Sequence, residues 1–203
     1  MPRVSAVKRR EDFIEAAVRV IARHGVDGAT TRRIAAEAGA PLASLHYCFN
    51  TKEQLFDEIF MEMGKTFAET VWHVRKGAGL GRTAAGLLRQ NMRWFQDNQA
   101  YAQAQLELLF WVARQSNELA RKTYQYFSDV TAERLRFGMR PDDDENLVGP
   151  LTTLIVAAGD GLLPVVVTFG FGATTESAID VMAESIERLA EAHRTAPAEL
   201  STN

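Results

Sequence analysis

The spacing of apolar side chains is the feature that most constrains what this chain can fold into. Along nearly the whole sequence they recur every three or four residues, as on one face of an α-helix, and no segment shows the alternation of a half-buried strand. The longer predicted helices lie at about 11–24, 52–76, 82–97, 100–115, 118–138, 146–169 and 175–194. With two short helices between the first two of these, we predict an all-α fold of about nine helices. Gly25 is expected to end the first of the longer helices with a left-handed stop, a capping box at Thr51 and Gln54 to begin the second, and residues 195–203 to form a polar tail.

Two short helices are predicted between about Thr30 and Phe49. Thr30 or Thr31 can cap the first helix, Gly39 can end it, and Pro41 suits the first turn of the second. The second is poor in apolar positions, of which Leu45 and Phe49 are four residues apart and can face inward together. Its outward side chains suit base edges and phosphates: Ser44, His46 and Tyr47. Two short helices around a glycine-containing turn are typical of a helix-turn-helix, although purely structural bundles contain the same corner.

The charge of the chain is unevenly distributed. Residues 1–54 hold nine Lys or Arg and six Asp or Glu, a net charge of +3, whereas the whole chain carries −3 and the remainder therefore −6. A basic N-terminal segment at residues 1–54, called the head below, followed by an acidic remainder favours a protein that contacts phosphate at one end. A dimer would double this basic surface. Ordinary charge scatter is the alternative.

The single cysteine, Cys48, excludes an intramolecular disulfide and fits a reducing compartment. The basic N-terminal segment at residues 1–12 lacks the apolar stretch of a secretory signal, so we expect a cytoplasmic protein. At residues 147–171 the chain is apolar enough to suggest a membrane span, but Asp160 lies in its middle. We therefore expect no membrane association, and interpret this helix as buried against its own domain and a second copy in a homodimer.

Catalytic and cofactor sites are not indicated. The glycines at 77–81 lack the spacing and the following Gly-Lys of a phosphate-binding loop, so we predict a helix–helix connection there. His46 and Cys48 are both metal-ligand types, yet His24, His73 and His193 have no partners at ligand spacing. We expect no metal, no cofactor and no enzymatic activity, because no nucleophile with a base is visible.

Three motifs between Phe13 and Phe60 resemble the N-terminal DNA-binding domain of the TetR family of repressors: AAxxxIARHG from residue 16, ATTRRIAAEAG from residue 29 and LHYCFNTKEQLF from residue 45. The resemblance implies a DNA-binding domain at 1–55, with the helix-turn-helix at about 30–49, and a ligand-binding and dimerisation domain at 56–203. Departures from the family pattern are Pro41, Ala43 and His46, which leave the operator sequence open.

The resemblance also assigns roles to residues. The residues implied to contact DNA are Thr30, Thr31, Arg32, Arg33, Leu42, Ala43, Ser44, His46, Tyr47 and Lys52. Each has a plainer alternative: the threonines only cap, the arginines are only solvated, and Tyr47 packs on the core of the head. The expected partners are a double-stranded DNA operator, a second copy of the chain and a small effector.

Large apolar side chains crowd residues 92–137, and such a stripe is more often core than pocket. Because the resemblance implies an effector held between helices, we expect an apolar or aromatic ligand. Its predicted contacts are Trp94, Phe110, Trp111, Tyr124 and Phe127. The function implied is a repressor released from a palindromic operator. The alternatives are a helical small-molecule-binding dimer without DNA function and a purely structural dimer.

Overall fold

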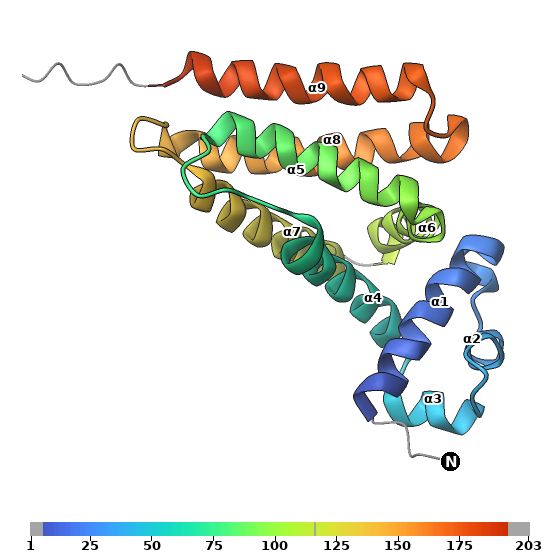
Figure 1. Ribbon diagram of the computed structural model, residues 1–203. Coiled ribbons are helices and arrows are strands. Elements are labelled where there is room, and N and C mark those ends of the chain that lie inside the picture. The colour runs from blue at the N-terminus through green and yellow to red at the C-terminus, as the bar shows by residue number, and fades with distance from the viewer. Residues whose placement is uncertain (1–5, 116, 195–203) are drawn as a thin grey trace, which may run out of the picture. The chain divides into compact units, whose positions relative to one another are not determined.

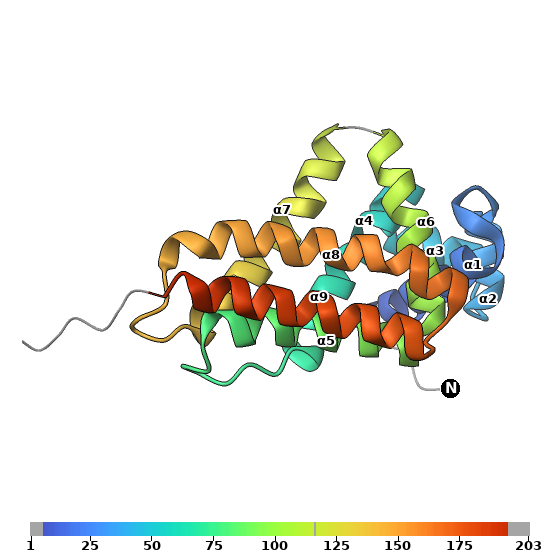
Figure 2. The same ribbon diagram turned by 90° about the horizontal axis from the view of Figure 1, so that it is seen from above.

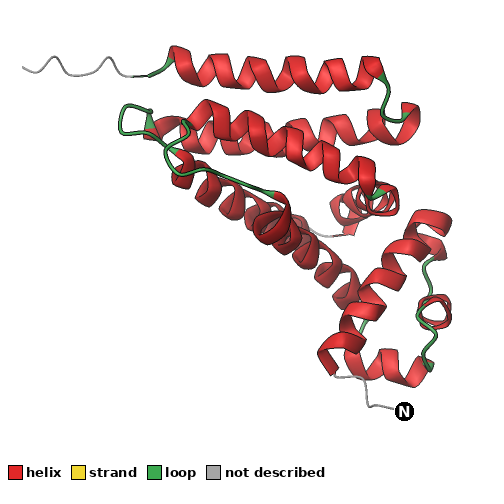
Figure 3. Cartoon of the chain, in the orientation of Figure 1, coloured by secondary structure: helices red, strands yellow, loops and turns green. Residues whose placement is uncertain are grey.

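The computed structural model describes residues 6–115 and 117–194, and these form nine α-helices and no strand (Figures 1 and 3). The helices are α1 (Ala6–Gly28), α2 (Thr31–Glu37), α3 (Leu42–Cys48), α4 (Lys52–Thr66), α5 (Leu80–Asp97), α6 (Gln99–Gln115), α7 (Asn117–Gly138), α8 (Val148–Phe169) and α9 (Ala173–Ala192). A π-helical turn, η1 (Phe67–Val71), follows α4, and a 3-10 turn, η2 (Glu145–Leu147), precedes α8. The predicted all-α fold is confirmed. The predicted polar tail, 195–203, lies outside the described residues.

The chain divides into two compact units. The first contains the residues up to Lys65 together with Asp97–Gln125, and the second contains Thr66–Gln96 and the residues from Tyr126 onward. The chain passes between them at the end of α4, at the end of α5 and within α7. Helix α6 therefore groups with the N-terminal helices, and a domain boundary at residue 55 stays a prediction.

The first unit has its core where α1 packs against α2, α3 and α6. Leu45 and Phe49, four residues apart, are each 1% exposed, which confirms that they face inward together. The Phe49 ring meets Phe13 edge-on at 6.3 Å between centroids. Gly25 has φ +67°, so the predicted left-handed stop is present, although one more helical turn follows it to Gly28. The Phe13 contact fixes the end of α3 against the N-terminal half of α1.

Capping explains where the short helices begin. Thr30 is the N-cap of α2, and its Oγ1 accepts a hydrogen bond from Arg33 N at 3.3 Å. Thr51 Oγ1 accepts from Gln54 N at 3.0 Å, which confirms the predicted cap of α4. The return bond differs from the usual capping box, because Gln54 Oε1 accepts from Asn50 N at 2.9 Å.

The prediction that the helix beginning near residue 52 continues to residue 76 is wrong. Helix α4 ends at Thr66, η1 ends at Val71, and Trp72 is extended (φ −83°, ψ 102°). Tertiary contacts hold Trp72 there, since its ring stacks on Phe67 at 5.9 Å and its Nε1 donates to Asn91 Oδ1 at 2.7 Å. The glycine-containing segment before α5 is a connection, as predicted.

Helices α8 and α9 lie side by side in the second unit (Figures 1 and 2). Among the described residues, one stretch, Glu145–Phe169, is long and apolar enough to cross a membrane by length and composition alone. A core helix of a soluble protein passes the same test, and one face of α8 is buried through Leu151, Ile155 and Leu162. Other apolar side chains of the pair are exposed: Leu154, Phe169, Val181, Met182 and Leu189.

Candidate functional site

Helix α3 presents nearly all of its side chains away from the core. Leu45 is its only buried residue, and Tyr47 is 87% exposed. Ala43 and His46 are also exposed, whereas Leu42 and Ser44 are half-buried. The alternative in which Tyr47 packs on the core of the head is therefore not what the structure shows. An outward face of hydroxyl, imidazole and phenol groups suits hydrogen bonding to base edges and phosphates.

The predicted contacts on α2 lie around its N-terminus. Thr30, Arg32 and Arg33 are exposed and Thr31 is half-buried. Arg33 Nη1 donates to the carbonyl oxygen of Gly28 at 2.6 Å. The first turn of a helix favours an anion because its amide groups and dipole point there. The structure thus brings Thr30, Thr31 and Arg32 together at one helix end, with Arg33 partly engaged within the protein.

Lys52 lies at the start of α4 and is half-buried. Its Nζ donates to the carbonyl oxygen of Val26 at 2.8 Å and lies 5.1 Å from the centroid of the Phe56 ring. The ammonium group has three protons, so a phosphate contact can share it with this carbonyl. Lys52 therefore also joins the start of α4 to the end of α1. The sequence did not predict this contact, because Val26 is 26 residues away from Lys52.

Sequence reasoning missed Arg10, which it counted only as one of the basic residues of the head. Its guanidinium donates to Glu58 of α4 and to the carbonyl oxygen of Cys48, the last residue of α3. The hydrogen bond with Glu58 raises the pKa of Arg10, while burial opposes this. No local sequence signal links Arg10 to Cys48, 38 positions away, or to Glu58, 48 positions away.

The predicted ligand contacts fall into different units. Trp94 and Phe127 belong to the second unit, and Phe110, Trp111 and Tyr124 to the first. Trp111 is buried with its ring edge-on to Phe56 at 5.2 Å, whereas Phe110 and Tyr124 are 54% and 38% exposed. Phe127 is half-buried. The Trp111 contact is core packing, and the ligand site assembled from these five residues stays a prediction.

Trp94 takes part in an aromatic cluster of the second unit with Phe67, Trp72 and Phe95. Phe67 is at its centre, with ring centroids 5.0 Å from Trp94 and 5.6 Å from Phe95, both edge-on. Phe67 is buried and Trp94 half-buried. Since Phe67 begins η1, this cluster lies directly after α4 along the chain.

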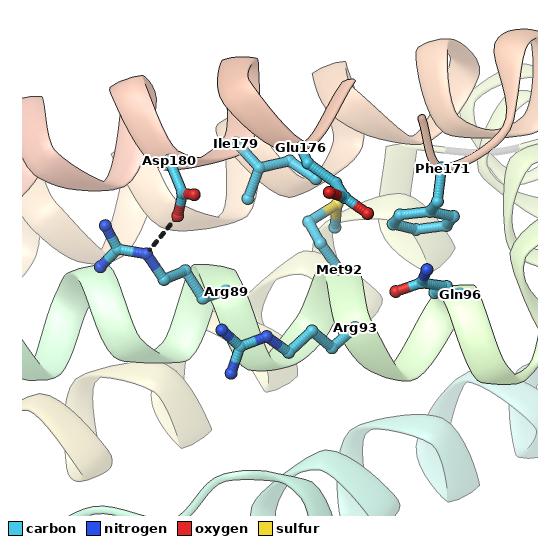
Figure 4. Close-up of a pocket in the computed structure, with 8 residues that line it drawn as sticks. All are labelled: Arg89, Met92, Arg93, Gln96, Phe171, Glu176, Ile179 and Asp180. Atoms are coloured by element: carbon cyan, nitrogen blue, oxygen red, sulfur yellow. Dashed lines mark hydrogen bonds and ion pairs between the residues drawn. The ribbon is translucent and has the colours of Figure 1, made fainter. Parts of the chain in front are cut away.

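A pocket of about 260 Å³ opens between α5 and α9 (Figure 4). Its lining comes from one face of α5, from the loop before α9 and from α9 itself: Arg89, Met92, Arg93, Gln96, Phe171, Glu176, Ile179 and Asp180. Arg89 Nε donates to Asp180 Oδ1 at 2.8 Å across the gap. The predicted aromatic residues do not line this pocket, whose rim is charged.

Comparison with known proteins places the head in a family. Residues 13–59 match the family model described as bacterial regulatory proteins, tetR family. The chain is 34% identical over 137 residues to the nicotine-responsive transcriptional repressor HdnoR of Paenarthrobacter nicotinovorans, covering 66% of this chain and 70% of that one. The chain belongs to the TetR family.

Other relatives agree with this assignment. The chain is 33% identical over 88 residues to the repressor AcnR of Corynebacterium efficiens, covering 43% of this chain and 45% of that one. The fold matches a TetR-family regulator from Rhodococcus with a TM-score of 0.70 and 17% identity, covering 90% of this chain and 98% of that one. As a TetR-family member, the protein is a ligand-responsive, DNA-binding transcriptional repressor. TetR-family regulators bind DNA and small effectors and act as dimers.

Proposed function

We propose that this TetR-family protein is a cytoplasmic homodimer that grips a palindromic operator with α2 and α3 and leaves it when a small effector binds. It acts by binding, without catalysis of its own. The observation that carries the proposal is the outward face of α3, where Tyr47 is 87% exposed and only Leu45 is buried. The hydroxyl, imidazole and phenol groups on this face can hydrogen-bond to base edges and phosphates.

The DNA contacts divide into two groups. The first group lies at the N-terminal ends of α2 and α4 and holds phosphate: Thr30, Thr31, Arg32, Arg33 and Lys52. The second group lies on α3, which enters the major groove and contacts base edges: Leu42, Ala43, Ser44, His46 and Tyr47. Tyr47, at the end of this face, can also reach the backbone.

A second copy of the chain covers the exposed apolar surface of α8 and α9. Val181 is 62% exposed and Phe169 78% exposed, with Leu154, Met182 and Leu189 also exposed on the same helix pair. Apolar side chains at helical spacing on two neighbouring helices suit a symmetric four-helix contact. The dimer then presents two copies of α3 to successive major grooves.

The effector is a small molecule with an aromatic or apolar ring. The half-buried Trp94 beside Phe67 offers ring faces and edges for stacking. Support also comes from HdnoR, a relative that responds to nicotine, which contains a pyridine ring. A ligand that displaces Phe67 shifts η1, and α4 runs from η1 back to Lys52 and the DNA contacts. Such a ligand shifts the population toward dimers whose two α3 helices are spaced wrongly for the operator.

A mobility-shift experiment tests the DNA interface. The wild-type protein first selects duplexes from a random library, and the selected duplex is then titrated with Tyr47→Ala and Lys52→Ala. We expect both variants to lose binding while sedimentation shows an intact dimer, and Tyr47→Phe to retain part of it through the ring. If Tyr47→Ala binds as tightly as wild type, the DNA interface is wrong. A helical small-molecule-binding dimer without DNA function would then be favoured.

A further inference from the structure

The C-terminal end of α3 is held by a side chain from α1. Arg10 Nη1 donates a hydrogen bond to the carbonyl oxygen of Cys48, the last residue of α3, at 2.6 Å. Arg10 Nε donates to Glu58 Oε2 of α4 at 2.6 Å, and Arg10 Nη2 bonds the other oxygen of the same carboxylate. One guanidinium group therefore joins three helices of the head.

The surroundings of this guanidinium restrict it further. It lies over the buried ring of Phe49, 4.6 Å from the centroid. Gln54 Nε2 donates to Glu58 Oε1 at 3.3 Å, so the carboxylate is itself held. The flat fork of arginine can bond a carboxylate with two nitrogens while a third reaches a carbonyl, and a lysine ammonium cannot reproduce this geometry.

Helix α3 has few other restraints. It has seven residues, its N-cap Pro41 makes no side-chain cap bond, and Leu45 is its only buried side chain. A helix this short has little stability of its own, so its direction depends on what holds its ends. The positive charge of Arg10 at the C-terminal end also suits the helix dipole.

We propose that Arg10, anchored by Glu58, is a positioning residue for sequence recognition: it fixes the end of α3 and thereby the angle at which Ser44, His46 and Tyr47 meet the bases. The inference rests on the proposed DNA interface. In this role Arg10 acts through α3, since one N–H on each of its three nitrogens serves Cys48 or Glu58.

The test uses Arg10→Lys, which keeps the positive charge, and Glu58→Gln, which removes the carboxylate that anchors Arg10. Affinity is measured by fluorescence anisotropy for the duplex that wild type selects and for a scrambled duplex, over a range of salt concentrations. We expect each variant to lose roughly tenfold in affinity for the selected duplex. Affinity for the scrambled duplex and the slope of log affinity against log salt stay as in wild type, since neither variant removes a phosphate contact.

Two controls separate positioning from folding and from direct contact. Lys122→Gln breaks the neighbouring ion pair with Asp57 of α4 (2.8 Å) and should leave the selected-duplex affinity unchanged. If Glu58→Gln fails to fold by circular dichroism, the milder Arg10→Lys decides. A phosphate-contacting Arg10 would be freed by Glu58→Gln, so affinity for both duplexes would hold or rise, and that result overturns the inference.

The other outcomes also decide. The positioning role is overturned in two cases, provided that wild type selects a duplex. Either the variants lose affinity equally for the selected and the scrambled duplex, or neither variant loses affinity. If wild type selects no duplex at all, the proposed DNA interface fails and this inference fails with it. Selective loss in both variants, with an unchanged control, supports it.

Discussion

Helix α5 contains two glycines whose replacement by alanine should change stability in opposite directions. At Gly81 an added Cβ would lie 2.7 Å from the backbone oxygen of Glu187 and 2.9 Å from the Cβ of Ala190, both on α9. At Gly86 the nearest atom to an added Cβ is Gln90 Nε2 at 3.5 Å, an ordinary contact. The two substitutions therefore test the close approach of α5 to α9. The same two helices line the pocket in Figure 4.

The magnitudes follow from these distances. Gly86→Ala adds helix propensity without a clash and should raise the free energy of unfolding by about 1 kcal/mol. Gly81→Ala meets backbone atoms that cannot rotate away, so α5 and α9 must separate, at a cost of about 1–3 kcal/mol. The propensity gain is smaller for Gly81 because it lies in the first turn of α5. We expect a difference between the variants of about 2 kcal/mol or more, or roughly 4–8 °C in Tm for a chain of this size.

Thermal unfolding followed by circular dichroism measures this difference, with both variants at the same protein concentration because the Tm of an oligomer depends on concentration. Equal Tm values, or a Gly81→Ala variant more stable than wild type, would refute the packing of α5 on α9.

Three further predictions concern the head and the dimer. Thr30→Ala removes the α2 cap and should cost about 1 kcal/mol in urea unfolding, whereas Thr30→Ser retains it; equal losses would contradict the cap. The hydrogen bond from Arg19, with the nearby Arg23, lowers the pKa of Glu37 below 4.5, so this carboxylate stabilises the fold above its unfolded pKa and that contribution is lost as pH falls. Glu37→Gln should therefore weaken the loss of stability below about pH 4.5 in an acid titration, and an unchanged titration would count against the pairing. Val181→Glu places a charge on the exposed apolar face of α9 and should shift sedimentation toward the monomer, while an intact dimer would exclude this face as the interface.

Local rules predicted most of the fold. Helices α5 to α9 begin and end within about two residues of the periodic segments, because burial of one helical face dominates each of them. Thr30, Gly39 and Thr51 were recognisable as caps and stops, since both cap bonds join residues three positions apart and the positive φ of Gly39 is a property of that residue alone. The end of α4 was missed because Trp72 leaves the helix for Phe67 and Asn91, a tertiary preference that periodicity does not encode.

The candidate site shows the same division. The outward residues of α3 followed from helical spacing around Leu45 and Phe49, and Tyr47 is exposed as the helix-turn-helix requires. The partners of Lys52 and Arg10 could not be predicted, because Val26, Cys48 and Glu58 come near them only after the three-helix head has folded. The large aromatic side chains of 92–137 could be read as core or as pocket, and the structure divides them between two units.

Hydroxyl-radical footprinting of the wild-type protein on its selected duplex tests the central claim most directly. A homodimer that places two α3 helices in successive major grooves should protect two patches on one face of the duplex, centred about 10 base pairs apart. Tyr47→Ala should remove both patches together. A single protected patch, or protection that survives in Tyr47→Ala, would contradict the account.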